Sequence, residues 1–161
     1  MDKQLEKLFQ DQIKNEWYSA YLYLSMAAYF EAANFEGFAK WMFKQATEEQ
    51  VHGKKMFDFL IDRGVKVVLQ AIQQPPADFA SPAAVFEMAW EHEQKVTALI
   101  NGIADQADKV NDRPAKVFIQ WFISEQVEEE KNASRILDLI KKIPPNSGAI
   151  YQLDHQLGKR E

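Results

Sequence analysis

Six side chains with metal-binding chemistry interrupt apolar stripes that otherwise recur at helical spacing. Glu49 and His52 are three positions apart, which places a carboxylate and an imidazole on one face of a helix, one turn apart. Fe(II) accepts this mixture of oxygen and nitrogen ligands and does not require a thiolate. The remaining interruptions are three carboxylates and an amide: Glu16, Glu93, Glu129 and Gln126. Together the six side chains could form an oxygen-rich cage for a pair of iron ions.

All six side chains fall near the middle of the segment that carries them. Apolar residues recur in steps of three and four along segments centred near residues 18, 50, 95 and 127. Each of the six lies within about three residues of a centre, hence within roughly 5 Å of it along a helix axis. Because helices of one bundle share a middle level, we expect the six side chains to meet.

Burying this many carboxylates requires a compensating charge. An unpaired buried carboxylate loses its hydration at a large cost in free energy, and no position of the four stripes offers Lys or Arg. The alternative is a polar layer that only fixes the register of the helices. Convergent acidic groups without a basic partner in the stripes favour bound divalent cations instead.

Glycine, proline and capping residues divide the chain into the helices that must position these groups. Gly64 closes the second helical segment, Ser81-Pro82 has the pattern of a helix start, and Pro144-Pro145 ends the fourth segment. Four long helices are predicted at about residues 3–33, 37–63, 82–110 and 112–142, followed by a short amphipathic helix at about 148–157.

The connection between the second and third helices, residues 65–81, is unusually long for a compact domain. A helix of about 27 residues is about 40 Å long, and about 17 extended residues reach about 56 Å. The connection can therefore return along the whole bundle and make these two helices parallel. The predicted fold class is all-α, with one domain at residues 1–161 and a bundle at 3–142 that has one long crossover, the ferritin-like arrangement.

Composition narrows the class of protein further. The 161 residues are 47% hydrophobic and 27% charged, as in an ordinary globular domain, and the absence of cysteine excludes disulfides, cysteine-ligated iron and thiol catalysis. A net charge of −5 without a basic stripe gives no indication of nucleic-acid binding. Neither an apolar run of about 18 residues nor a secretion signal is present, so we expect a cytoplasmic protein that does not span a membrane.

Over nearly its whole length the chain resembles the non-haem ferritins of prokaryotic type. The motifs that carry the resemblance are Asn15-Glu16, Ser19–Leu24, Glu48–His52, Glu91–Glu93, and Trp121–Glu130. The short helix at the C-terminus belongs to the same pattern. As a set these motifs are highly specific, whereas the Glu-x-x-His unit alone is not.

The resemblance implies roles for the six stripe residues. Glu16, Glu49 and His52 would bind the first iron ion. Glu49 and Glu93 would bridge to or approach the second ion, and Glu129 would lie nearby. Gln126 would lie in the second coordination sphere of the iron or close to the bound oxygen. Tyr23 would form a hydrogen bond at the site and, with Trp121, supply an electron.

A third and weaker iron site is also implied by the resemblance. It would use Glu48, Glu125, Glu128 and Glu129. The competing interpretation of Glu125, Glu128 and Glu130 is a solvated acidic face of the fourth helix.

The chain lacks residues that are typical of several families related to the non-haem ferritins, or has an element that they lack. Bacterioferritins have a second Glu-x-x-His in the fourth helix, where this chain has Gln126-Val-Glu-Glu129. They also have a haem-ligating Met directly after the Glu of the second helix, where this chain has Gln50, so no haem is expected. Rubrerythrin-like proteins need a cysteine iron site, and mini-ferritins lack the fifth helix. His92 should pack or face solvent, and His155 could line a contact between subunits without being a ligand.

The implied function is iron storage by a ferroxidase, which oxidises Fe(II) with dioxygen or peroxide and deposits a ferric oxide mineral in a hollow shell of 24 identical subunits. One alternative is a shell subunit that only nucleates mineral, against which the intact site residues argue. Another is a di-iron enzyme for an organic substrate, which the large stripe residues leave no obvious room to bind: Phe9, Phe30, Phe86 and Phe122.

Overall fold

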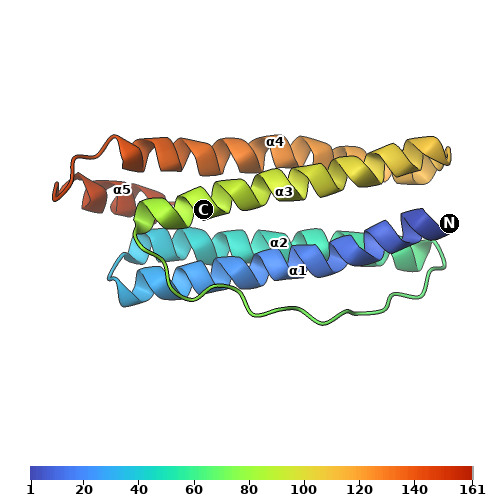
Figure 1. Ribbon diagram of the computed structural model, residues 1–161, viewed down its shortest axis with the longest axis horizontal. Coiled ribbons are helices and arrows are strands. Elements are labelled where there is room, and N and C mark those ends of the chain that lie inside the picture. Colours follow the sequence, from blue (N-terminus) through green and yellow to red (C-terminus); the bar gives the residue numbers. More distant parts are fainter. Residues whose placement is uncertain (161) are drawn as a thin grey trace.

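The computed structural model describes residues 1–160, and within that range five α-helices make up the regular structure. The long helices are α1 (Lys3–Ala32), α2 (Glu36–Asp62), α3 (Pro82–Lys109) and α4 (Arg113–Lys141), and the short α5 spans Ala149–Leu157. Figure 1 shows α1 beside α2 and α3 beside α4 in one bundle, with α5 folded back at one end. The predicted all-α fold with a short C-terminal helix is confirmed.

The helix ends lie where short polar residues satisfy free backbone groups. The side chains of Asp2, Ser81 and Asp112 accept hydrogen bonds from first-turn N–H groups of α1, α3 and α4. Asn34 and Asn111 have φ values of 59° and 52°, the left-handed conformation that commonly follows a helix. Each observed helix bound differs from its predicted position by no more than one residue.

The segment between α2 and α3 runs back along the length of the bundle (Figure 1). Contacts with α1 fix its path: Gln10 Nε2 donates to the Lys66 carbonyl at 2.8 Å, and the Val68 N–H donates to Gln10 Oε1 at 3.1 Å. Near the other end, Ser25 Oγ donates to the Pro76 carbonyl at 2.5 Å. The predicted crossover, and with it the parallel arrangement of α2 and α3, is confirmed.

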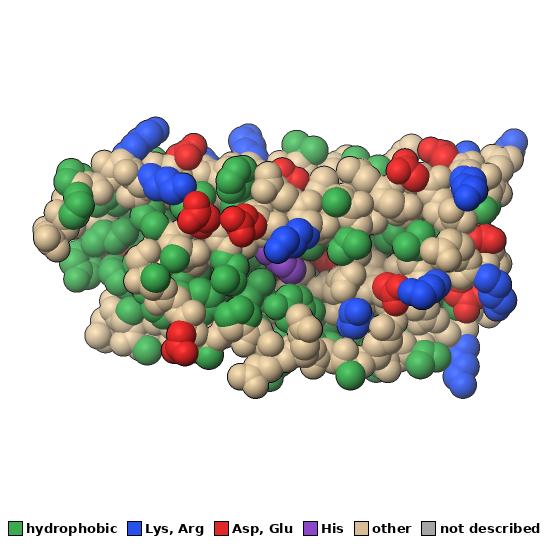
Figure 2. Space-filling view, in the orientation of Figure 1, with side chains coloured by type: hydrophobic (Ala, Val, Ile, Leu, Met, Phe, Trp, Pro, Cys, Tyr) green, Lys and Arg blue, Asp and Glu red, His purple; other side chains and the backbone are tan. Residues whose placement is uncertain are grey.

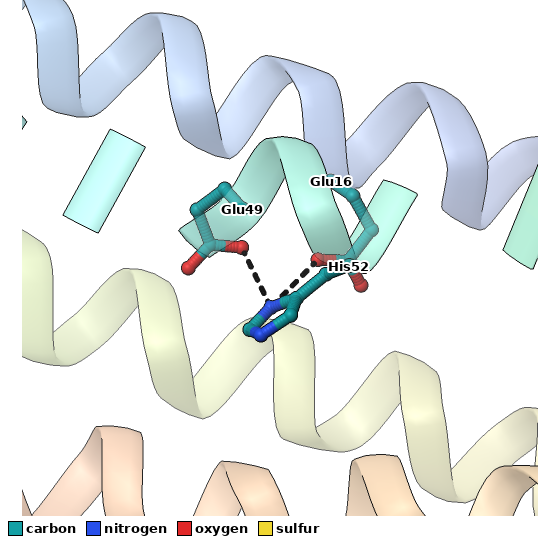
Figure 3. A group of neighbouring side chains, drawn as sticks. All are labelled: Glu16, Glu49 and His52. Atoms are coloured by element: carbon teal, nitrogen blue, oxygen red, sulfur yellow. Dashed lines mark ion pairs between the residues drawn. The ribbon is translucent and has the colours of Figure 1, made fainter. Parts of the chain in front are cut away.

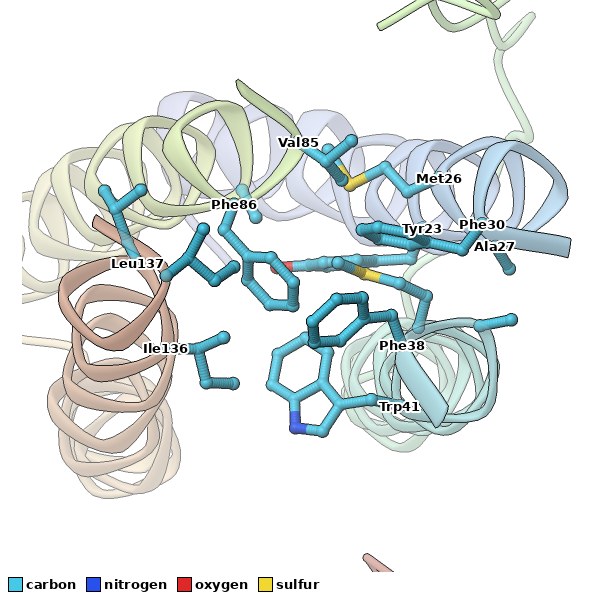
Figure 4. Packing of buried hydrophobic residues seen from close by; sticks show 14 of the residues in the cluster. Tyr23, Met26, Ala27, Phe30, Phe38, Trp41, Val85, Phe86, Ile136 and Leu137 are labelled. Atoms are coloured by element: carbon cyan, nitrogen blue, oxygen red, sulfur yellow. The ribbon is translucent and has the colours of Figure 1, made fainter. Parts of the chain in front are cut away.

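Two apolar clusters fill the interior of the bundle. Figure 4 shows the first cluster, in which aromatic side chains from α1, α2 and α3 converge. There the ring of Phe38 lies 5.0 Å from that of Phe30 and 5.7 Å from that of Phe86, centroid to centroid. In the second cluster Phe59 stacks on Phe118 with centroids 4.0 Å apart.

A buried polar layer separates the two clusters. On α1, Ile13 belongs to one cluster and Leu22 to the other, and Glu16 lies between them with 1% of its surface exposed. The same succession recurs on α3, where Glu93 lies between Ala89 and Val96. The apolar packing on both sides therefore holds the polar side chains at one level of the bundle.

The exterior carries charges of both signs. Figure 2 shows acidic and basic side chains interspersed over one face, with hydrophobic side chains gathered toward the end where α5 lies. Within residues 1–160, no helix combines the length and the apolar character needed to cross a membrane.

Candidate metal centre

Neighbouring turns of α1 and α2 bring three metal-binding side chains together (Figure 3). His52 Nδ1 lies 3.4 Å from Glu49 Oε2 and 3.7 Å from Glu16 Oε2. All three residues are buried, and one ligand atom from each lies within 4.8 Å of the others. A single cation could therefore contact two carboxylates and an imidazole.

Close packing of α1 against α2 makes this convergence possible. Gly53 of α2 faces Trp17 of α1, and a Cβ at position 53 would lie 2.7 Å from Trp17 Nε1 and 3.3 Å from the Cβ of Glu16. A larger residue would push α1 away from α2. Gly53 thus sets the separation at which Glu16 reaches the two ligands of α2.

Helices α3 and α4 complete the polar layer from the opposite side. Gln126 Nε2 donates to Glu93 Oε2 at 3.1 Å and to the Glu93 carbonyl at 3.2 Å. The Tyr23 hydroxyl donates to the other carboxylate oxygen of Glu93, which brings α1 into contact with α3. The hydrogen bond that was expected of Tyr23 is present in the structure.

Two glutamines that the sequence analysis did not single out orient the carboxylates. Gln12 Nε2 donates to Glu16 Oε1 at 2.8 Å, and Gln45 Nε2 donates to Glu129 Oε2 at 2.6 Å and to Glu49 Oε1 at 3.3 Å. Each glutamine precedes its glutamate by four residues in the same helix, which places both on one face. That spacing is the signal by which they could have been found. We call the six predicted stripe residues the buried centre: Glu16, Glu49, His52, Glu93, Gln126 and Glu129.

Burial dominates the electrostatics of the buried centre. It raises the pKa of Glu49 well above its ordinary value, that of Glu93 to about 8 and that of Glu129 to about 7. Burial alone would lower the pKa of His52, but the carboxylates of Glu16 and Glu49 beside the ring favour its protonated form, outweigh the burial and raise that pKa to about 11. Protons therefore occupy sites that a divalent cation could take over.

One oxygen of the buried centre accepts no hydrogen bond, although His52 Nδ1 lies 3.7 Å from it. Of the buried side-chain nitrogen and oxygen atoms in residues 1–160, Glu16 Oε2 alone makes no hydrogen bond. A buried carboxylate oxygen left in this way is strongly unfavourable. Because it points to the space shared with Glu49 and His52, a cation in that space would satisfy it.

A second group of acids lies beside the buried centre, and we call it the acidic flank: Glu48, Glu125 and Glu128. Glu125 Oε1 lies 3.9 Å from His52 Nε2, and these two residues form a possible ligand group with Glu129. Glu48 instead accepts a hydrogen bond from Arg160 Nη2 at 2.5 Å, and Glu128 is exposed. The structure thus gathers part of the set predicted for a third ion and leaves Glu48 and Glu128 outside it.

Trp121, which was expected to act with Tyr23, stands beside His52. The two ring centroids are 5.4 Å apart, and Lys55 Nζ lies 3.8 Å from the centre of the indole on its face.

Neither of the two other histidines belongs to a group of possible ligands among residues 1–160, and the expectation that they bind no metal stays a prediction. His92 Nε2 is 2.7 Å from Ser19 Oγ, and its ring centroid is 5.9 Å from that of Tyr18. Burial lowers the pKa of His92 to about 4. His155 is exposed on α5.

Comparisons with known proteins agree on one family. Residues 6–143 match the family model described as a ferritin-like domain. The chain is 39% identical over 160 residues to a bacterial non-heme ferritin of Bacteroides fragilis, covering 99% of both chains, and 35% identical to that of Staphylococcus saprophyticus, covering 99% of this chain and 96% of the relative. An open-pore ferritin of the archaeon Archaeoglobus fulgidus superimposes with a TM-score of 0.98 at 40% identity, over 100% of this chain and 99% of that one.

Proposed function

The chain belongs to the ferritin family, and from that premise we propose that its buried centre is the ferroxidase site of an iron-storage protein. Fe(II) is the substrate, dioxygen or peroxide is the oxidant, and a ferric oxide mineral inside a hollow shell is the product. With dioxygen, two Fe(II) ions each lose one electron and dioxygen takes up both, so that it is reduced to the level of peroxide.

The observation that carries the proposal is the unpartnered oxygen of Glu16. It is buried at the point where α1 and α2 also present Glu49 and His52. Carboxylate and imidazole ligands suit iron, and the anionic oxygens favour the ferric state because they stabilise the higher charge.

We assign the ligands as follows. Glu16, Glu49 and His52 bind one iron ion, and Glu49, Glu93 and Glu129 face the second. Gln126 and Tyr23 hold Glu93 through hydrogen bonds, which support this positioning role. Gln45 holds Glu129 and Glu49 in the same manner.

A third iron ion would bind more weakly at the acidic flank. The approach of Glu125 to His52 and Glu129 supports this site. Binding by Glu48 as well would require it to leave Arg160, and Glu128 would have to turn inward from the surface. Such rearrangement makes the third ion the weakest of the three.

The storage function also requires a shell, for which we propose 24 copies of this chain. Exposed apolar residues support association of copies along α1 and the crossover segment: Tyr21, Leu24, Val68, Leu69 and Ile72. We further propose that the shell binds no haem, because Gln50 stands where bacterioferritins have a haem-ligating Met. The cytoplasmic location stays a prediction from the sequence.

The organic-substrate alternative finds no support in the interior. Phe9, Phe30 and Phe86 have no exposed surface, and Phe122 has 2%. These side chains fill the two apolar clusters on either side of the polar layer, where a substrate would need space.

The proposal is tested by anaerobic Fe(II) titration of the metal-free protein, followed by rapid mixing with dioxygen under visible absorbance. We expect a break at two or three ions per chain and a fast coloured intermediate. The double variant Glu49→Ala with His52→Ala should lose both the break and the fast oxidation. A matched control, Glu91→Ala with His155→Ala, removes the same residue types from exposed positions and should retain both. Unchanged kinetics in the first variant would contradict the assignment.

A further inference from the structure

Helix α5 and residues 158–160 fold back toward the metal centre. Asp154 of α5 accepts a hydrogen bond from the Phe38 N–H at 2.7 Å, which caps the first turn of α2, where Phe35 provides no side-chain cap. The backbone at Gly37 approaches that of α5 so closely that a Cβ there would lie 1.7 Å from the Asp154 carbonyl oxygen. The position of α5 on α2 is therefore specified by contacts that only glycine permits.

This docking brings Arg160 to the border between the buried centre and the acidic flank. Its Nη1 donates to Gln45 Oε1 at 2.9 Å and its Nη2 donates to Glu48 Oε2 at 2.5 Å. The guanidinium also lies over the ring of Trp41, 4.8 Å from its centre. Two directed hydrogen bonds and a stacked aromatic ring define one orientation for the arginine.

Arg160 thereby fixes the amide of Gln45. Because the Gln45 oxygen accepts from Arg160, its NH₂ group must face Glu129 and Glu49, to which it donates. The C-terminal segment is thus linked through one amide to two carboxylates of the buried centre. Arg160 makes no hydrogen bond to either carboxylate, so it positions them through Gln45, and its positive charge also favours the ionised form of Glu129.

The same guanidinium also holds Glu48, which the proposed third ion would need. The Arg160 and Glu48 side chains are 23% and 34% exposed, so their ion pair is only moderately strong and can exchange. A metal ion bound to this carboxylate would lie beside the guanidinium, and the two positive charges would repel each other. Metal and arginine therefore compete for one carboxylate.

We propose that Arg160 is the resident counter-cation of the acidic flank and that a third metal ion must displace it. Arg160 is a positioning residue that holds Glu48 directly and Glu129 through Gln45 in the metal-free protein. On displacement, residues 158–160 separate from α2. The C-terminal segment therefore sets the affinity of the flank for metal directly and acts on the buried centre only through Gln45 and through its charge. This inference rests on the proposed function.

The test is calorimetric titration of the assembled metal-free protein with Zn(II), a probe that does not undergo oxidation. In the wild type we expect tight binding at the buried centre and a weaker transition at the flank. Arg160→Ala should strengthen the weak transition by about fivefold and change the tight transition less. Lys159→Ala removes the same charge from an exposed neighbour and should change neither transition.

A double-mutant cycle separates competition from a general loosening of the C-terminus. In a Glu48→Gln background, Arg160→Ala should no longer strengthen the weak transition, because the shared carboxylate is gone. Amide hydrogen exchange gives a direct readout of displacement. The N–H groups of Lys159 and Arg160, which donate to the Gln156 and Leu157 carbonyls, should exchange faster once the weak transition is saturated.

The outcomes distinguish this inference from the proposed function. Tight binding with an unchanged weak transition in Arg160→Ala would overturn the inference and leave the proposed function standing. The inference would also be overturned, with the proposed function left standing, if Arg160→Ala strengthened the weak transition as much in the Glu48→Gln background as in the wild type. Absence of any Zn(II) binding in both proteins would overturn the proposed function, and the inference would fall with it.

Discussion

The buried centre and the acidic flank hold the same kind of side chain under opposite conditions. Glu16, Glu49 and Glu93 have 2% or less of their surface exposed, whereas Glu48 and Glu125 are partly exposed and Glu128 is exposed. A buried carboxylate must be protonated, paired or bound to a cation, because water cannot solvate it. A carboxylate of the flank can be satisfied by water or by Arg160. A proton or a cation is thus a requirement at the centre, whereas at the flank water can take its place.

The largest effect should follow from removing one anionic oxygen of the centre. Glu16→Gln retains the shape of the side chain and the acceptor for Gln12. We expect it to weaken tight Zn(II) binding by at least about a hundredfold. The metal-free variant should remain folded and melt close to the wild-type temperature, because the lost contact with His52 is offset by the removal of a buried charge that accepts no hydrogen bond. Calorimetry measures the affinity, and thermal melting measures the stability.

If the variant binds Zn(II) more weakly and still melts close to the wild-type temperature, unfolding is excluded as the cause of the weaker binding. Glu125→Gln is the matched control at the flank, and it should leave tight binding within about twofold of wild type, as exposed ion contacts are weak. Equal loss of tight binding in both variants would mean that centre and flank act as one site, and the comparison would fail.

The buried centre was predictable because burial itself leaves a pattern in the sequence. The stripes marked Glu16, Glu93 and Glu129 as inward-facing, and glycine, proline and asparagine marked the helix ends. Gln45 was missed because an amide within an apolar stripe does not by itself indicate a partner, and Gln12 was missed because it lies beside the stripe of its helix and not in it. Their spacing from the ligands becomes meaningful only with the hydrogen bonds in view.

The flank was less predictable because exposed positions follow no period. Glu125 and Glu128 are one turn apart on α4, yet only Glu125 faces His52. Arg160 could not be placed from the sequence, since its approach depends on contact between Asp154 and Phe38, 116 positions apart. A tertiary contact of this kind has no local signature.

A moderate effect should appear in the pH dependence of the metal-free protein. The pKa of Glu93 is raised from 4.5 to about 8, so the folded state holds a proton that the unfolded state releases between these values. Its contribution to stability is present below pH 4.5 and is lost as the pH rises through 8. Glu129, raised to about 7, and His52, raised from 6.5 to about 11, act in the same direction. Melting temperature should therefore fall as the pH rises from about 5 to 8.

Glu93→Gln tests whether this slope arises at the buried centre. The amide does not titrate, so the melting temperature of the variant should fall less steeply than that of wild type over the same range. Glu91→Gln, an exposed position on the same helix, should reproduce the wild-type slope. Saturating Zn(II) should reverse the wild-type trend, because the metal displaces protons and binds more tightly at higher pH. If melting temperature falls equally steeply with pH in the wild type and in Glu93→Gln, the raised pKa of Glu93 does not cause the trend. The electrostatic difference between the buried centre and the acidic flank would then lack support.

The smallest effect should be a difference in metal binding between two residues of the acidic flank, Glu125 and Glu128. Glu125 Oε1 stands 3.9 Å from His52 Nε2, whereas Glu128 points to solvent one turn away on the same helix. Glu125→Gln should weaken the third Zn(II) ion by about fivefold, and Glu128→Gln by less than about twofold. Both variants lose one negative charge from α4, so a general field effect would weaken binding equally in each. Unequal effects, measured in the weak calorimetric transition, would show that contact geometry selects the ligand. If Glu128→Gln has the larger effect, the third ion draws the exposed side chain inward, and the flank is shaped by the metal it binds.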